Sequence, residues 1–213
     1  MTAVQMNSES PPEDSSTLVL ETKRLVLRAP RLEDAEAIAL LANNRKIAEM
    51  TELIPYPYRI ENAEAWIASL TEKGQSTTFA LFAKDQGLAF IGACGYGMRE
   101  ETTPEIGYWI SEPFWVRGYA TEAVRAMIDH AFTTTDFDAL AAGCRVTNLA
   151  SRRVLEKCGF QWTRADLCRI RAIGASVPSD RFRLDRRIWA SLRTWGRTTL
   201  PGRARATKGL GKR

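Results

Sequence analysis

The stretch FWVRGYATEAVRAMIDHAF, residues 114–132, decides the fold. Its apolar residues recur every three or four positions: Ala120, Val124, Met127, Ile128, Ala131 and Phe132. This spacing places all of them on one side of a helix. The sequence therefore predicts an amphipathic helix over residues 119–134 that packs against a sheet.

Two strand-like segments flank this helix. EIGYWIS (105–111) precedes it and ALAAGCRV (139–146) follows it. A strand, a helix and a strand in this order predict two parallel strands joined by a right-handed crossover. Residues 79–97 instead show two apolar runs around a turn at 85–87, which favours an antiparallel hairpin. We therefore expect a mixed α/β sheet.

Further segments extend the predicted sheet and its helices. We expect strands at 24–30, 166–173 and 181–184, and helices at 32–44, 62–70, 149–158 and 185–195. Asn148 can cap the helix that follows it, and Gly159 can end that helix in the left-handed conformation.

The start of helix 119–134 lacks the side chain that usually caps a helix. Ser, Thr, Asp or Asn normally accepts hydrogen bonds from the free N–H groups there. Here Gly118 and Ala120 keep the backbone accessible. A helix N-terminus also carries about half a positive charge, which suits a diphosphate. Small residues at this place can also serve only to let the helix pack tightly against the sheet. The surrounding sequence is therefore needed to choose between the two explanations.

The residues around this turn resemble those of one protein family. The run from Trp115 to Ala120 matches the pattern Q/R-x-x-G-x-G/A, with Trp115 in place of Gln or Arg. The chain resembles the GNAT N-acetyltransferases, in particular the ribosomal-protein N-terminal acetyltransferase (RimJ/RimL-like) branch. Four more stretches carry the likeness, which spans about residues 20–195: 24–41, EIGYWIS, NLASRRVLEKCGF (148–160) and RFRLDRRIW (181–189).

The resemblance implies an α/β (α+β) fold of about seven strands with four to five flanking helices, in which two parallel strands splay apart. It also implies acetyl-coenzyme A as donor, with its pantetheine arm between those strands. The backbone at Ile110 would face the thioester and Asn148 would hold the pantetheine. The remaining expected contacts to the cofactor are Trp115, Val116, Arg117, Gly118, Tyr119, Ala120, Thr121 and Ser151.

Two residues are candidates for the acid–base chemistry. Many family members place a tyrosine seven residues after the Asn, but this chain has Leu155 there. Ser151 occupies the position of a serine proposed for proton donation in the ribosomal-protein branch, and we expect it to hydrogen-bond or relay. Glu105 corresponds within one position to a glutamate used as general base in some relatives, and an ordinary surface glutamate remains the alternative.

Composition narrows the remaining possibilities. The chain has 213 residues, which suits one domain, here 18–195, between a disordered tail at 1–17 and a basic flexible tail at 196–213. Its formal net charge is +5, and residues 196–213 contain six basic residues and no acid. No transmembrane run and no secretory signal is evident, so we expect a cytoplasmic protein. Four cysteines without a C-x-x-C pair suggest no metal site.

The sequence thus favours an enzyme that acetylates a primary amine, either a protein N-terminus or a small molecule, by direct attack in a ternary complex. A non-catalytic acyl-coenzyme A sensor is the first alternative. Ribosome or RNA association through the basic tail is the second, and its affinity would fall steeply with salt. The sequence leaves the acceptor and the oligomeric state open, a homodimer included.

Overall fold

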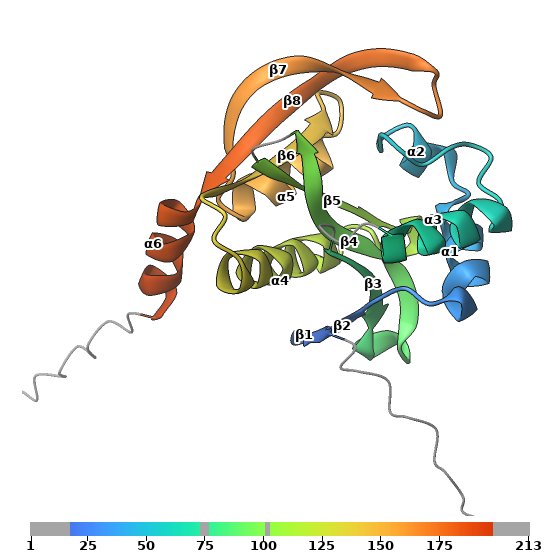
Figure 1. Ribbon diagram of the computed structural model, residues 1–213, viewed down its shortest axis with the longest axis horizontal. Coiled ribbons are helices and arrows are strands. Elements are labelled where there is room, and N and C mark those ends of the chain that lie inside the picture. The colour runs from blue at the N-terminus through green and yellow to red at the C-terminus, as the bar shows by residue number, and fades with distance from the viewer. Residues whose placement is uncertain (1–17, 73–76, 101–102, 198–213) are drawn as a thin grey trace, which may run out of the picture.

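The computed structural model describes residues 18–72, 77–100 and 103–197, which form one mixed sheet with helices on both faces (Figure 1). The strands are β1 (Val19–Glu21), β2 (Leu25–Arg28), β3 (Thr77–Ala83), β4 (Ala89–Glu100), β5 (Thr103–Ile110), β6 (Ala139–Arg145), β7 (Gln161–Ile170) and β8 (Ala175–Asp185). The helices are α1 (Ala35–Ala42), α2 (Arg45–Ala48), α3 (Ile60–Glu72), α4 (Tyr119–Thr134), α5 (Leu149–Lys157) and α6 (Arg186–Arg197). Single 3₁₀ turns are η1 (Leu32–Asp34), η2 (Lys84–Gln86) and η3 (Glu112–Phe114).

The sheet has the strand order β1-β2-β3-β4-β5-β6-β8-β7. Strands β5 and β6 pair in parallel, and the other neighbouring strands pair antiparallel. Helix α4 makes the crossover between β5 and β6, as the sequence predicts. The expected mixed α/β fold is confirmed.

The two faces of the sheet carry separate cores. On one face, α4 and α5 pack against the sheet, and the predicted stripe of α4 is buried, with Val124 and Met127 both 0% exposed. Each such large side chain stabilises the fold by about 1.5–3 kcal/mol. On the other face, α1 and α3 pack through Ile38 and Ala63 against Phe90 of β4. Strand β5 lies where the two cores meet, with Ile106 and Ile110 in the first core and Trp109 packed against the second.

Two short elements go beyond the sequence expectation. The three residues of β1 add an eighth strand at the sheet edge, and the four residues of α2 add a sixth helix. Both are too short for a hydrophobic period to be visible in the sequence. Asn44 marks the start of α2, since its side chain accepts a hydrogen bond from the Lys46 backbone.

The last two strands are longer than predicted. β7 starts at Gln161 and β8 already at Ala175, so the pair forms a long hairpin that extends over α2 (Figure 1). Pro178 is a reason to read no strand there, because proline disrupts a sheet ladder. In the structure the β6–β8 pairing ends at Arg145 and Ser179, and the Pro178 carbonyl accepts from Val146. Pro178 thus lies just past the end of the β6–β8 ladder, although β8 stays paired with β7 there.

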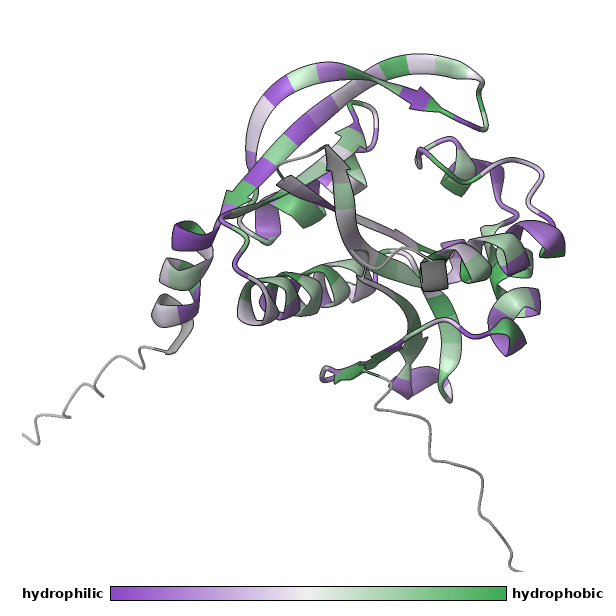
Figure 2. Ribbon diagram, in the orientation of Figure 1, coloured by the Kyte–Doolittle hydropathy of each residue, from purple (hydrophilic) through white to green (hydrophobic). Residues whose placement is uncertain are grey.

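The hairpin is strongly polar. Hydrophilic residues recur along both of its strands (Figure 2), and most side chains of β7 are exposed. Its far end contacts the segment between α2 and α3, where the Arg171 N–H donates to the Glu52 carbonyl at 3.0 Å. The hairpin and this segment therefore meet on the side of the sheet away from α4.

Some sequence expectations concern residues that the structure does not describe. The proposed tail at 1–17 and the part of the basic tail from 198 to 213 lie outside the described residues. Within the described ranges, no helix is long and apolar enough to cross a membrane. The same ranges contain no group of three or more His, Cys, Asp or Glu residues that could hold a metal ion.

Candidate active site

Strands β5 and β6 pair over a short length only. Their register joins Glu105 to Ala141 and Ile106 to Ala142, and among the described residues it goes no further. Beyond this point β6 stays paired with β8 as far as Arg145. The carboxyl-terminal half of β5 therefore leaves its parallel neighbour, as the family resemblance implies.

The loop before α4 has an unusual backbone. Val116 and Gly118 have φ values of 63° and 81°, and the Val116 side chain is fully exposed. Gly118 is the N-cap of α4, and glycine has no side chain to accept from the first turn. The first intrahelical bond runs from the Glu122 N–H to the Gly118 carbonyl. The N–H groups of residues 119–121 thus lack intrahelical acceptors, which makes this turn suited to an anion.

Arg24 of the β1–β2 turn braces this loop. Its guanidinium donates to the Arg117 carbonyl at 2.8 Å and forms an ion pair with Glu122 at 2.7 Å. The Glu122 carboxylate also accepts from the hydroxyl of Thr22 and the N–H of Arg24. The first-turn acid of α4 is therefore held toward β1 and β2.

These contacts set the charge of Glu122. Burial alone would raise the pKa of the carboxyl group, but the hydrogen bonds from Thr22 and Arg24 outweigh it and hold the pKa below its usual value. The carboxylate is thus ionised and compensated by Arg24 at neutral pH. Neither sequence period nor motif signals this interaction, because 98 positions separate the two residues.

Aromatic side chains tie the loop to the sheet. The Trp115 indole N–H donates to the Ile110 carbonyl at 2.6 Å, at the end of β5. The Tyr119 hydroxyl donates to Asp85 at 2.6 Å, in the turn between β3 and β4. Arg117 lies with its guanidinium 5.6 Å from the centre of the Phe114 ring. Trp115 replaces the Gln or Arg of the family pattern, and its indole N–H still provides a hydrogen bond that fixes the loop.

Helix α5 begins as predicted. The Asn148 side-chain oxygen accepts from the Ser151 N–H at 3.1 Å, and Gly159 follows the helix with φ 92°. The amide NH₂ of Asn148 supplies two donors that can serve a ligand. Ser151 lies one turn into the helix and is partly buried.

The Ser151 hydroxyl meets a residue that the sequence did not single out. Its oxygen lies 2.8 Å from the hydroxyl of Tyr108 on β5. Leu155, at the position of the usual family tyrosine, is fully buried. Tyr108 was missed because 43 positions separate it from Ser151. The only available signal was the alternation of EIGYWIS, which places Tyr108 on the same face as Ile106 and Ile110.

Glu105 lies on the opposite face of β5. Its carboxylate forms an ion pair with Arg181 of β8 at 3.3 Å, and 18% of its side chain is exposed. Gly107 follows on the same face, exposed and with open space at the position of a side chain. Glu105 and Tyr108 are about 10 Å apart along the strand. The two candidate acid–base residues, Glu105 and Ser151, are therefore not in contact.

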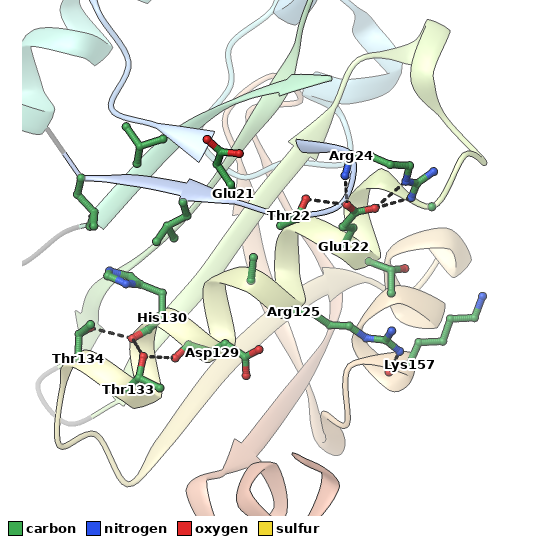
Figure 3. A pocket seen from close by; sticks show the side chains of 16 residues that line it. Glu21, Thr22, Arg24, Glu122, Arg125, Asp129, His130, Thr133, Thr134 and Lys157 are labelled. Carbon is green, nitrogen blue, oxygen red and sulfur yellow. Dashed lines mark hydrogen bonds and ion pairs between the residues drawn. The ribbon is translucent and has the colours of Figure 1, made fainter. Parts of the chain in front are cut away.

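A groove of about 1050 Å³ runs along the outer side of α4, between this helix and β1 (Figure 3). It is large enough for a nucleotide-sized ligand. Gly118 and Thr121 line it beside Arg125 and Lys157. Arg125 donates to the backbone carbonyl of Lys157 at 3.0 Å, and both residues line the groove. This corner of the groove favours anions.

Residues 24–161 match the family model described as the acetyltransferase (GNAT) domain. The chain belongs to the GNAT acetyltransferase family. It is an acyltransferase.

Relatives of this GNAT chain include several bacterial proteins. It is 30% identical over 146 residues to the uncharacterized N-acetyltransferase p20 of Bacillus licheniformis. This match covers 67% of this chain and 82% of that protein. It is also 30% identical over 93 residues to the ribosomal-protein-serine acetyltransferase of Escherichia coli. That match covers 43% of this chain and 50% of the E. coli protein.

A solved structure agrees with the fold of this GNAT domain. RimL, a ribosomal L7/L12 alpha-N-protein acetyltransferase in complex with coenzyme A, superposes with a TM-score of 0.68 at 18% identity, covering 79% of this chain and 98% of that one. The GNAT family expected from the sequence is confirmed, and both the E. coli protein and RimL are named as ribosomal-protein acetyltransferases.

Proposed function

We propose that this enzyme transfers the acetyl group of acetyl-coenzyme A to a primary amine by direct attack in a ternary complex. The observation that carries the proposal is the end of the β5–β6 pairing beside the uncapped start of α4. Donor and acceptor then approach from opposite faces of β5. No covalent enzyme intermediate is needed, because an amine attacks a thioester directly.

Donor binding rests on the loop before α4. The N–H groups from Val116 to Thr121 are the proposed ligands of the pyrophosphate, and Gly118 admits the phosphates closely. Trp115 holds this loop against the Ile110 carbonyl. We assign the thioester to the region of Ile110 and the pantetheine amides to the Asn148 NH₂. These assignments keep the donor on the α4 and α5 face.

The basic corner of the groove beside α4 offers a second anionic subsite. Arg125 and Lys157 lie next to Thr121, so they would meet a phosphate of the donor outside the pyrophosphate. Coenzyme A is strongly anionic, and charge-assisted hydrogen bonds from arginine suit phosphate oxygens.

The acceptor amine approaches from the α1 and α3 face. Gly107 leaves open space there, two residues along the same face of the strand from Glu105. We assign Glu105 the role of general base, acting through water because an acceptor near Ile110 would be several residues along the strand. Ser151, on the opposite face, hydrogen-bonds the departing thiol.

A protein N-terminus suits a weak base. An α-amine with a pKa near 7.7–8.0 is about one tenth neutral at pH 7, whereas a lysine near 10.4 is neutral in fewer than about one molecule in a thousand. The E. coli relative is named for acetylating a ribosomal protein. We therefore propose an α-amino acceptor as the first class to test.

Release of free thiol from acetyl-coenzyme A tests the function directly. The panel contains peptides with a free N-terminus, the same peptides with a blocked N-terminus and one lysine, and small amines. We expect thiol release with free α-amines and an acetylated product by mass spectrometry. Tight binding of acetyl-coenzyme A without thiol release on any amine would instead identify an acyl-coenzyme A sensor.

A further inference from the structure

The phenol of Tyr108 extends from β5 to the side of α5 that carries Ser151. Its hydroxyl lies 2.8 Å from the Ser151 hydroxyl oxygen and 3.3 Å from the Ser151 carbonyl oxygen. The Tyr108 ring packs against the core on the α4 and α5 face of the sheet, and this packing fixes the direction of its hydroxyl. The contact joins β5 to α5 at the level where β5 has left β6.

The position matters because the usual tyrosine is replaced. Leu155 stands there, fully buried and without a polar group. Ser151 lies one turn before Leu155 on the same helical face. In this chain a phenol thus reaches the same neighbourhood from β5 rather than from α5.

We propose that Tyr108 is a positioning residue for acetyl transfer, donating a hydrogen bond to Ser151 so that the Ser151 hydroxyl hydrogen points at the sulfur of the departing coenzyme A. This inference rests on the role proposed above for Ser151. A phenol is a stronger donor than an aliphatic alcohol, so the tyrosine donates and the serine accepts. Ser151 keeps its own hydrogen for the sulfur.

The protonation states leave both hydroxyls able to donate. Burial raises the pKa of the Tyr108 phenol above its ordinary value, and the hydrogen bond with Ser151 offsets only part of this effect. The phenol is therefore protonated at neutral pH. The neighbouring thiol of Cys144 also contacts Ser151, and burial raises its pKa to about 11. Cys144 is thus neutral, and no anion competes with the sulfur for the Ser151 hydrogen.

The reaction balances without consuming either hydroxyl. The C–N bond forms as the C–S bond breaks, and the sulfur leaves with the electron pair. Ser151 donates a hydrogen bond to that sulfur and lowers the cost of its charge. The proton released by the attacking amine finally neutralises the thiolate. Tyr108 and Ser151 end each turnover in their starting states.

The variants Tyr108→Phe and Ser151→Ala, alone and together, test the proposal. The first keeps the ring and removes only the hydroxyl. We expect Tyr108→Phe to lower kcat about 10-fold while the KM for acetyl-coenzyme A stays within about twofold. Because Tyr108 acts through Ser151, the double variant should lose no more than Ser151→Ala alone. Tyr96→Phe, another buried tyrosine of the same core on β4, is the matched control and should keep its activity.

A second readout needs no acceptor amine. Coenzyme A is bound to each variant, and the pKa of its thiol is measured from the ultraviolet absorbance of the thiolate. We expect a higher thiol pKa in Tyr108→Phe and Ser151→Ala than in the unchanged protein, with no further rise in the double variant. If the unchanged protein acetylates no amine, the proposed function fails, while this titration still decides the role of Tyr108.

Two results would overturn the inference. One is a kcat and a thiol pKa in Tyr108→Phe equal to those of the unchanged protein. The other is a loss in the double variant that equals the product of the two single losses, which would show that Tyr108 acts independently of Ser151. The thermal unfolding temperature of each variant is measured as well, so that a loss of activity caused by poorer packing is recognised.

Discussion

Glu105 and Tyr108 project from opposite faces of strand β5. Glu105 pairs with Arg181 on the face that α1 and α3 cover, and Tyr108 bonds to Ser151 on the face of α4 and α5. A single strand thus separates the proposed base from the hydroxyl that serves the leaving thiol. This arrangement lets the amine lose its proton on one side while the sulfur departs on the other.

Substitution of Gly118 should weaken donor binding. Gly118→Ala adds a Cβ at φ 81°, in the loop whose N–H groups are assigned to the pyrophosphate. We expect at least about tenfold weaker binding of acetyl-coenzyme A, measured by calorimetry, since strain of about 1–3 kcal/mol would reshape the loop. Gly87→Ala is the control, because Gly87 has a similar φ of 65°, open space around it and a place in another turn. Equal affinity in both variants would remove Gly118 from the donor site.

The ion pair of Glu122 should make stability depend on pH. The folded-state pKa of Glu122 is below its ordinary value of 4.5, so its contribution is fully present above that value and is lost as the pH falls through the folded-state pKa. At pH 7 we expect Glu122→Gln to lower the free energy of unfolding by about 1–3 kcal/mol, because Arg24 loses its charged partner. Urea unfolding should show this difference shrinking at acid pH. A difference that stays constant from pH 7 to acid pH would contradict the assignment.

The role of Glu105 can be separated from that of its ion pair. Glu105→Gln should lower kcat/KM about 10²-fold or more and leave acetyl-coenzyme A binding unchanged, as for loss of a general base. Arg181→Met breaks the same ion pair but keeps the carboxylate, so we expect a much smaller kinetic loss. Equal losses in the two variants would show that the pair matters structurally and that Glu105 is not the base.

The basic corner beside α4 should distinguish coenzyme A from dephospho-coenzyme A. We expect Arg125→Ala to weaken coenzyme A binding about tenfold, which corresponds to about 1.4 kcal/mol, while the affinity for dephospho-coenzyme A changes less than about twofold. Arg153→Ala removes an exposed arginine of α5 outside the groove and serves as control. Equal weakening of both ligands by Arg125→Ala would place the arginine elsewhere along the donor.

Local patterns were enough to predict most of the elements. The period of residues 120–132 predicted α4 with the bounds that the structure gives, and the flanking apolar runs predicted β5 and β6. Asn148 and Gly159 marked both ends of α5. These features depend on neighbours within one or two turns of chain, where sequence spacing and position in space are directly related.

The sequence by itself thus determined the family, the crossover and the uncapped turn at Gly118, because each follows from contiguous residues. Only the tertiary structure decided which side chains meet: Arg24 with Glu122, Tyr108 with Ser151, and Glu105 with Arg181. Each of these pairs joins residues that are distant along the chain, and their contact depends on strand order and register. A strand also sends successive side chains to opposite faces. Which face then receives which helix is set by packing, and local spacing does not encode it.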